Sequence, residues 1–518
     1  MLKSMKAGLR PLLAGCVAAA ALVGAAASPA HAEWRKAESE RFVVYSEGSE
    51  ANLRRFVQRL EIFDRVLNVR LTSSMGEAPP RKLPIYLVGS RSDLVTVRPQ
   101  LGENIVGYYI PSAQDIFAMA IRDADDDTLL HEYAHHFMFQ NSPYPYPAWF
   151  VEGFAEYYMT AEFKSDRVLV GQANTNRAYW LQGGRWLDMR ALLSTRPGTR
   201  AKGSETYYPL AWLLTHWFWG NPERQVQLTA YLNDVAAGGD PVEAIQRATG
   251  LDMPQLRREL RRYMNGRIPY QGVVMDIPVV PMSVAVLPAS ADALLILGQR
   301  VKLLDADDDD AAAVLAEVRR AAARYPGDTL ATLVQARAEF KVGDAAVADT
   351  LATGLLEREP ENVEALQLLA EARLKASRDA DDPDVANQRR IEANRFLGRA
   401  FRADDANYRT FMLLAETRSG QPGYPTENDI ATLELAQQLA PQLPDTVLRL
   451  CAMLLQTGQT EKALLMLEPL ANSPHGGGGA AAAKAMIGTI KGVDADEAEG
   501  EPEPEPEPDD AAEAPGQS

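Results

Sequence analysis

Three of the six histidines in this 518-residue sequence lie within six residues, at positions 131, 135 and 136. Two of them belong to His131-Glu132-Tyr-Ala-His135, which has the pattern H-E-x-x-H. Residues four apart on a helix lie about one turn apart on the same face, so these two imidazoles can bind one zinc ion. The glutamate beside the first histidine is then placed to act as a general base. The alternative is an amphipathic helix in which the histidines are incidental.

The segment with this pattern has strong helix signals. Neither Pro nor Gly occurs between Thr128 and Gln140, and Asp125, Asp126 and Asp127 precede it. Aspartate side chains accept hydrogen bonds from the free N–H groups of a first helical turn, where the helix dipole also favours negative charge. We therefore predict a helix over residues 128–140.

A second run supplies two more carboxylates: Pro147-Ala-Trp-Phe-Val-Glu152-Gly-Phe-Ala-Glu156. Proline is favoured at the first position of a helix, so a second helix is predicted from Pro147. A hydrolytic zinc site needs a third protein ligand and an open position, and Glu152 follows His135 by 17 residues, enough for the chain to turn and return. Glu156, one turn later, can accept a hydrogen bond from a metal-bound histidine. The alternative is a solvated helix face.

Together these two segments resemble the gluzincin metallopeptidases. His131-Glu132-Tyr-Ala-His135 followed by W-F-V-E-G-F-A-E-Y is similar to thermolysin-like enzymes, to gluzincin aminopeptidases and especially to bacterial peptidase-MA-like domains. The resemblance implies that His131, His135 and Glu152 bind zinc and that Glu132 is the catalytic base. It also implies an α+β zincin-like catalytic domain, with a mixed sheet beside the H-E-x-x-H helix.

A strongly apolar helix is predicted from Glu205 to Trp219. The gluzincin aminopeptidases have a tyrosine in a Y-x-x-G-x-A-L-L helix that stabilises the oxyanion of the reaction. When the two helices are aligned so that Ala211 stands at the glycine of that pattern, Tyr208 stands at its tyrosine. Tyr207 and His216 are alternative oxyanion donors. For all three residues, packing in the core is the alternative to a catalytic role. The sequence has no G-x-M-E-N segment, which holds the substrate's amino terminus in those aminopeptidases, so an endopeptidase is favoured.

Strands are predicted before the metal helix, over residues 41–46, 82–88, 106–110 and 115–120, and a helix over residues 51–67. By the resemblance, the strand immediately before the metal helix would be the edge that pairs with an extended peptide. Gly107 and Tyr108 would then lie near the cleft, with packing as the alternative for the tyrosine. A helix over residues 253–264 would close the catalytic domain, which we place at residues 33–270.

The second half of the chain has a different organisation. Pro278, Pro281 and Pro288 exclude a helix over residues 271–290, which we predict as a linker. Residues 291–475 are rich in Ala and Leu, and Pro326 and Pro360 are 34 residues apart, the tetratricopeptide period. An all-α domain of tetratricopeptide-like repeats is predicted, able to bind a protein partner on a concave surface. An irregular helical bundle is the alternative.

The two ends of the chain have distinctive compositions. Residues 1–32 read as a signal peptide with a basic start, an apolar run and an A-x-A cleavage site, which predicts a periplasmic or secreted protein. Lipid anchoring at Cys16 is the rival interpretation. Residues 476–518 are Gly/Ala-rich and then acidic and proline-rich, so a disordered tail is predicted, with a short helix over residues 480–490 within it.

Charge and cysteine content exclude other classes of protein. The formal net charge of the whole sequence is −17. Without the eleven acidic residues of 493–518 and the three basic residues of the predicted signal peptide, the net charge is −9. This acidic balance argues against nucleic-acid binding. No membrane span is expected after signal cleavage. Cleavage would leave Cys451 as the single cysteine, so a metal site must use histidine and carboxylate.

The hypothesis from sequence is an exported zinc metallopeptidase that acts on peptide or protein substrates. In it, Glu132 activates a water for attack on the peptide carbonyl, and Tyr208 stabilises the oxyanion. Two alternatives remain: a catalytically inactive scaffold whose repeats bind partners, and a zinc hydrolase of a non-peptide amide or ester.

Overall fold

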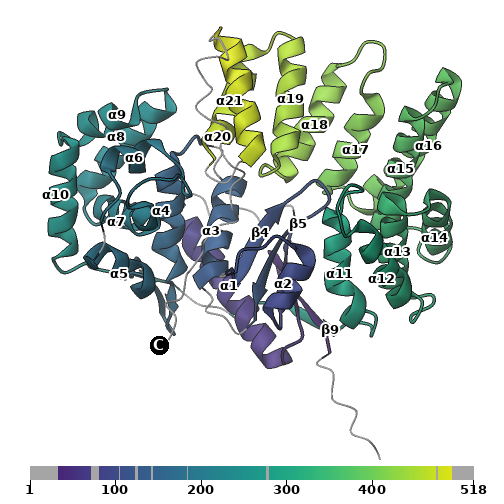
Figure 1. Cartoon of the computed structure of the whole chain (residues 1–518), viewed down its shortest axis with the longest axis horizontal. Helices are drawn as coiled ribbons and strands as arrows, with labels where there is room; N and C mark the ends of the chain where they lie inside the picture. Colours follow the sequence, from purple (N-terminus) through teal and green to yellow (C-terminus); the bar gives the residue numbers. More distant parts are fainter. Residues whose placement is uncertain are drawn as a thin grey trace, which may run out of the picture.

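The computed structural model describes residues 33–71, 81–103, 105–122, 127–141, 144–183, 185–275, 279–473 and 477–492. The predicted signal peptide with Cys16, the aspartates at positions 125 and 126, and the acidic part of the predicted tail, 493–518, lie outside these residues. A mixed sheet with surrounding helices forms the first half, and paired helices form the second (Figure 1).

Six strands form the main sheet, in the order β4-β5-β3-β2-β1-β9. β2, β3 and β5 are parallel to one another, and the remaining neighbours are antiparallel. The four strands predicted before the metal helix are confirmed as β2 to β5. The bounds are β1 (Arg35–Glu38), β2 (Phe42–Ser46), β3 (Leu83–Val88), β4 (Gly107–Pro111), β5 (Ile116–Ile121) and β9 (Ser283–Val286).

Alternate side chains of the sheet face two helix layers, as the pleat of a strand requires. Val44 and Ile85 share a core with α1 and α3, whereas Tyr86 and Phe117 share one with α2 and α11. The helix predicted over residues 51–67 lies within α1. The bounds of the helices beside the sheet are α1 (Glu50–Leu71), α2 (Arg91–Val97), α3 (Asp127–Asn141) and α11 (Ala291–Leu303).

The edge of the sheet nearest α3 is β4, not the strand immediately before the metal helix. That strand, β5, lies between β4 and β3, so the prediction of an edge there is wrong. Tyr108 does not lie near the α3 side of the sheet, where the cleft was predicted. Its hydroxyl donates to the Leu94 carbonyl of α2 at 3.1 Å, on the opposite face of the sheet. Tyr109, one residue later, faces α3, because a shift of one residue along a strand changes the face of the sheet.

The metal helix and the next seven helices form a compact layer beside the sheet (Figure 1). The helix predicted over 128–140 is confirmed as α3. α4 begins at Ala148, with Pro147 as its N-cap rather than its first residue. The bounds are α4 (Ala148–Met159), α5 (Thr175–Gly183), α6 (Met189–Ser194), the 3-10 turn η1 (Ser204–Thr206), α7 (Tyr207–Trp219), α8 (Pro222–Ala236), α9 (Pro241–Thr249) and α10 (Met253–Met264).

Residues 271–290, predicted as a linker, contribute a strand to each of two sheets. β8 (Gln271–Val274) pairs with β7 (Arg167–Val170) in a small sheet that also contains β6 (Glu162–Phe163). β9 pairs with β1 and forms the far edge of the main sheet. The prolines exclude a helix, but they flank valine-rich segments that pair at sheet edges, where proline is tolerated.

The second half is an array of consecutive helix pairs. α11, α13, α15 and α17 stack on one another, and each of α12, α14 and α16 contacts its sequence neighbours. α13 and α15 begin at residues 34 apart, in agreement with the repeat period. The bounds are α12 (Ala311–Ala322), α13 (Thr329–Val342), α14 (Ala345–Arg358), α15 (Val363–Arg378), α16 (Pro383–Ala403), α17 (Tyr408–Arg418), α18 (Glu427–Leu439), α19 (Pro444–Gln456) and α20 (Thr460–Asn472).

The short helix expected over residues 480–490 is confirmed, whereas the start of the predicted disordered tail at residue 476 is too early. Residues 477–491 form α21 (Gly477–Lys491), which packs on α19 and α20. Alanine is the strongest helix former, and the small side chains of Ala480 and Ala483 are fully buried against the neighbouring helices. None of the described helices is long and apolar enough to span a membrane.

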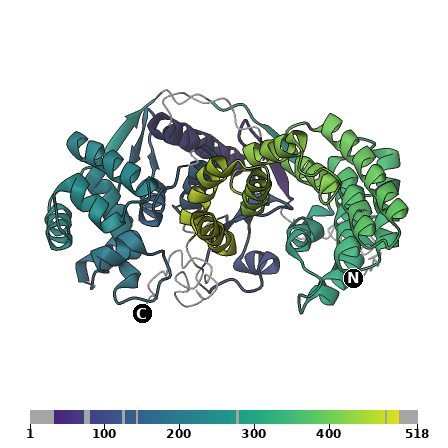
Figure 2. The same ribbon diagram turned by 90° about the horizontal axis from the view of Figure 1, so that it is seen from above.

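The array curves over the sheet, so that its last helices lie above the centre of the molecule (Figure 2). Side chains of α17 to α20 belong to the same buried core as α3 and α4. The β4–β5 turn (residues 112–115) enters the inner side of the array, where Asp115 pairs with Lys302 at 2.7 Å and Gln114 accepts from Arg337 at 2.8 Å. We refer to this region as the hairpin–array contact.

Candidate metal centre

Three side chains converge where α3 and α4 meet. His131 Nε2 and His135 Nε2 are 3.0 Å apart, and Glu152 Oε2 lies 3.5 Å from the first and 3.2 Å from the second. The helix geometry of α3 places the two imidazoles one turn apart, and α4 returns to present the carboxylate. We call these three residues the candidate metal centre, as their spacing in the sequence predicted.

The separations match those around a tetrahedral zinc ion. Ligand atoms about 2.0–2.1 Å from a zinc ion are about 3.4 Å apart at tetrahedral angles. All three residues are buried, and Glu152 is fully so. A buried carboxylate requires a cation or strong hydrogen bonds, because its desolvation is costly. Two nitrogens and one carboxylate oxygen are also the donor set that zinc binds in hydrolases.

The electrostatics of the centre favour a positive charge. Burial lowers the pKa of His131, but hydrogen bonding to the Glu152 and Glu156 carboxylates outweighs burial and raises it to about 9. In the metal-free chain a proton on His131 supplies that charge. Zinc binding requires the neutral imidazole, so the ion would replace the proton.

Glu132 lies on α3 between His131 and His135. It is 9% exposed, whereas His131, His135 and Glu152 are 3%, 2% and 0% exposed. Glu132 as a residue is therefore slightly more exposed than the three residues of the candidate metal centre. This position suits a group that exchanges a proton with water.

A chain of polar side chains supports His131 from behind. Glu156 Oε1 lies 3.1 Å from His131 Nδ1, where the sequence predicted it, and Arg177 Nη1 of α5 lies 2.6 Å from the same oxygen. The Arg177 guanidinium also lies 4.5 Å above the Tyr208 ring. Carboxylates that orient a metal-bound histidine raise its basicity and fix its ring. Arg177 was missed by the sequence reasoning, because no motif connects it with either helix.

Tyr208 is the one of the three candidate oxyanion donors that lies beside the centre. Its ring is 6.3 Å from that of His131, and it is partly exposed. The buried Tyr207 donates its hydroxyl to the Thr195 carbonyl at 3.0 Å. His216 Nδ1 lies 2.9 Å from the Tyr263 hydroxyl, and burial lowers its pKa to about 4.

The position of Glu152 depends on the glycine that follows it. A Cβ on Gly153 would lie 2.1 Å from Thr215 Oγ1 and 2.5 Å from the Ala211 carbonyl oxygen of α7. Contacts this short are impossible, so α4 and α7 approach closely only with glycine here. The small Ala211 faces the same close approach, and the helix that bears Tyr208 is thereby held against the helix that bears Glu152.

His136 has a structural role. Its Nδ1 lies 3.0 Å from the Tyr109 hydroxyl of β4 and 3.2 Å from Gln442 Nε2 of the α18–α19 loop. Gln442 also donates to Gln140 at 2.8 Å. The edge strand, the metal helix and the array therefore meet next to the candidate metal centre, a contact that no local sequence pattern indicates.

Comparison with protein-family models found no match, and comparison with curated proteins found none. Among solved structures, a thermophilic TPR protein from Thermus thermophilus is similar to part of the chain. The identity is 20%, the alignment covers 39% of this chain and 99% of that chain, and the TM-score is 0.33. A TM-score this low does not establish a shared fold. The evidence that the second half consists of repeats is therefore the packing of its own helices.

Proposed function

We propose that this protein is a zinc-dependent peptidase that cleaves within polypeptide chains. The observation that carries the proposal is the convergence of two imidazole nitrogens and one carboxylate oxygen, 3.0–3.5 Å apart, in a buried position. Glu132 lies between the two histidines on α3, and Tyr208 lies beside them.

Each residue has a distinct role in this proposal. Zinc held by His131, His135 and Glu152 would supply Lewis acidity toward a peptide carbonyl and a water. Glu132 accepts a proton from the water as its oxygen bonds to the carbonyl carbon. The same group gives that proton to the amide nitrogen as the C–N bond breaks, so Glu132 is regenerated.

Tyr208 is proposed to donate a hydrogen bond to the carbonyl oxygen while that oxygen carries negative charge. Arg177 pairs with Glu156 and packs on the Tyr208 ring, so it can position both the carboxylate behind His131 and the proposed oxyanion donor.

The free edge of β4 supports an extended peptide as substrate. In an antiparallel ladder, every second residue directs its N–H and C=O toward the partner strand. Ile121 N donates to the Val106 carbonyl at 2.9 Å, so Val106 and Tyr108 face β5. Gly107 and Tyr109 direct their backbone groups outward, and within the described chain no other backbone or side chain hydrogen-bonds to them. A peptide added along this edge would pass close to α3.

The array of helix pairs is proposed to bind the substrate or a protein partner. Stacked helix pairs present an extended surface suited to such binding. This part of the proposal does not require catalysis, and it is the part that the inactive-scaffold alternative would retain.

The test compares wild type with Glu132→Gln for bound zinc, by mass spectrometry, and for hydrolysis of a panel of denatured proteins and small amides and esters. We expect about one zinc per chain in both proteins. We expect cleavage of the denatured proteins by wild type alone. Equal hydrolysis by a zinc-loaded Glu132→Gln would sink the mechanism, and cleavage of small amides or esters alone would show a non-peptide hydrolase.

A further inference from the structure

The inner side of the array is partly filled by the β4–β5 turn. The Tyr408 hydroxyl donates to the Ser112 carbonyl at 3.1 Å, and Gln114 Nε2 donates to Glu371 at 3.2 Å. Arg337 donates to the other end of the same glutamine side chain. Repeat proteins present this type of surface to ligands. Here the protein's own hairpin occupies a part of it.

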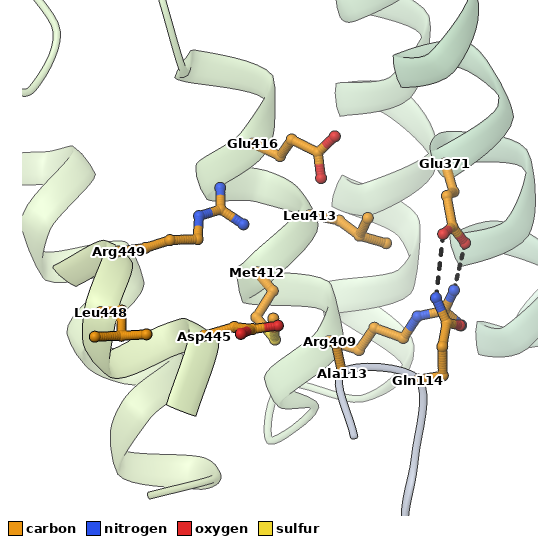
Figure 3. Close-up of a pocket in the computed structure, with 10 residues that line it drawn as sticks. All are labelled: Ala113, Gln114, Glu371, Arg409, Met412, Leu413, Glu416, Asp445, Leu448 and Arg449. Carbon is orange, nitrogen blue, oxygen red and sulfur yellow. Dashed lines mark hydrogen bonds and ion pairs between the residues drawn. The ribbon is translucent and has the colours of Figure 1, made fainter. Parts of the chain in front are cut away.

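A pocket of about 310 Å³ opens beside this turn (Figure 3). Ala113 and Gln114 form one wall, and side chains of α15, α17 and α19 form the others. Its apolar lining comes from Met412, Leu413 and Leu448. This volume lies at the small end of pockets that bind ligands, and it suits a large apolar side chain with the peptide backbone around it.

The charged groups around the pocket balance one another. Arg409 pairs with Glu371, and Glu416 pairs with an arginine of α15. Asp445 and Arg449 carry opposite charges, extend toward the other lining side chains (Figure 3), and make no ion pair among the described residues. A strongly acidic or basic ligand gains nothing from this arrangement. An uncharged peptide can place an apolar side chain on the lining and its N–H and C=O groups against these two charges.

The pocket continues the line of the free β4 edge. β4 ends at Pro111, and the pocket begins at Ala113. An added strand advances about 3.3 Å per residue, so the four residues from the level of Tyr109 to that of Ala113 span about 13 Å. Tyr109 contacts His136, the neighbour of the ligand His135. A peptide that lies along β4 at the level of Tyr109 and His136 therefore reaches the pocket about four residues further on.

We propose that this pocket holds an apolar side chain of the substrate polypeptide, about four residues from the bond that is cleaved. The inference rests on the proposed function, because it takes the β4 edge as the peptide site. It makes the array a part of substrate recognition. Selected substrates are extended segments with a residue such as leucine or methionine at that distance.

Binding is measured with full-length, zinc-loaded Glu132→Gln, which should leave the probe intact. The probes are fluorescein-labelled, end-capped peptides of alternating threonine and leucine, of twelve and of four residues. A third probe has twelve residues with lysine in place of each leucine. Fluorescence anisotropy then gives the Kd of each. We expect the twelve-residue Thr/Leu peptide to bind about tenfold or more tightly than either other probe, because one buried leucine contributes that much.

Two matched variants test whether the affinity for the twelve-residue Thr/Leu peptide depends on the pocket. Leu448→Glu places a charge in the apolar lining, whereas Leu455→Glu changes a similarly half-buried leucine two turns further along the same face of α19, outside the pocket. We expect about a tenfold rise in Kd for the twelve-residue peptide with the first variant and little change with the second. Arg449→Ala, which leaves the apolar core intact, is a further variant that should weaken the same peptide if Leu448→Glu does not fold.

Equal affinity for the two Thr/Leu lengths, tighter binding of the lysine probe, or equal losses in both leucine variants would overturn the assignment. Failure of the proposed function gives a different pattern. In that case wild type does not hydrolyse the twelve-residue peptide, while the length dependence and the Leu448→Glu loss persist.

Discussion

The protein buries two clusters of charged groups that differ in how their charges are satisfied. In the hairpin–array contact, Asp115 lies 2.6 Å from Arg81 and 2.7 Å from Lys302, and Arg337 lies 2.7 Å from Glu364. Each charge there has an opposite partner from the chain. In the candidate metal centre, the candidate ligand atoms of two imidazoles and one carboxylate lie within 4.8 Å of one another.

The comparison separates a structural cluster from a binding cluster. An ion network whose members neutralise one another needs nothing further, and its main consequence is to fix the arrangement of the elements that it joins. Two imidazoles that converge with one carboxylate offer lone pairs that a proton or a metal cation can occupy. Variants in the two clusters should therefore change different observables: stability for the first, and zinc and catalysis for the second.

Removal of a ligand should have the largest effect. His135→Ala leaves two ligand side chains, and bound zinc should fall from about one per chain to near zero. Mass spectrometry measures the metal, and thermal unfolding with and without a chelator should show a drop in Tm for wild type alone. Gln114→Ala, in the hairpin–array contact, is the control and should keep its zinc. Retention of zinc by His135→Ala would show that the metal is not bound at the candidate metal centre.

Glu132→Gln should separate catalysis from metal binding. The amide is similar in shape but cannot accept the proton, so kcat should fall by about 10²–10⁴ with zinc content unchanged. Peptide hydrolysis at saturating substrate gives kcat. A loss of zinc in this variant would mean that Glu132 belongs to the ligand set rather than to the proton transfer.

Arg409→Met should show the opposite behaviour, with zinc kept and stability lost. Arg409 is 6% exposed and pairs with Glu371, and removal of one partner of a buried pair costs about 3–5 kcal/mol. Glu371 keeps its bond from Gln114, so we expect the low end of that range. Urea unfolding measures the change. Arg378→Met is the matched control, because that exposed arginine should cost at most about 1 kcal/mol.

Two buried aspartates, Asp64 beside α3 and Asp115 in the hairpin–array contact, should respond oppositely to acid. Asp64, which accepts from Tyr133 of the metal helix at 2.6 Å, has its pKa raised by burial from 3.8 to about 6. Burial also raises the pKa of Asp115, but Lys302 and Arg81 outweigh it and hold the pKa below its ordinary value. The folded state therefore binds a proton more tightly at Asp64 and less tightly at Asp115 than the unfolded state does.

These pKa shifts determine how the free energy of unfolding changes with pH. For Asp64, the free energy of unfolding should fall by up to about 3 kcal/mol as the pH rises from about 4 to 6, and Asp64→Asn should remove this dependence. The contribution of Asp115 is present above its unfolded pKa and is lost as the pH falls through its lower folded value. Asp115→Asn should thus differ most from wild type near neutral pH. Urea unfolding between pH 2 and 7 covers both transitions, that of Asp115 below pH 4 and that of Asp64 between pH 4 and 6, and parallel slopes for the two variants would contradict this contrast.

Arg177→Met should have the smallest effect of this set. It removes the cation that holds Glu156 against His131, and such supporting residues typically contribute 10–100-fold to metal affinity or activity, or about 1.4–2.7 kcal/mol. Competition with a chelator measures the zinc affinity. Arg177→Lys keeps the charge and should recover part of it. Unchanged zinc affinity and unchanged kcat in Arg177→Met would assign this arginine to packing on Tyr208 alone.

The candidate metal centre was predictable because its residues are determined by local geometry. The spacing of four in α3 predicted the histidine pair, the carboxylate 17 residues later offered a candidate third ligand, and Glu156 follows from one further helical turn. Arg177 and Gln442 follow from no such rule. They reach the site from α5 and from the α18–α19 loop, and only the packing of those elements brings them there.

The sequence by itself determined the local elements: the metal helix, the strands before it, and the helix pairs of the second half. Their periodicities and breaking residues act over a few residues, and so can be read without the fold. Only the tertiary structure decided that β4 rather than β5 is the edge, that Tyr109 rather than Tyr108 faces α3, and that the linker supplies two strands. It also decided that the array closes over the β4–β5 turn, because these choices depend on which distant surfaces are buried together.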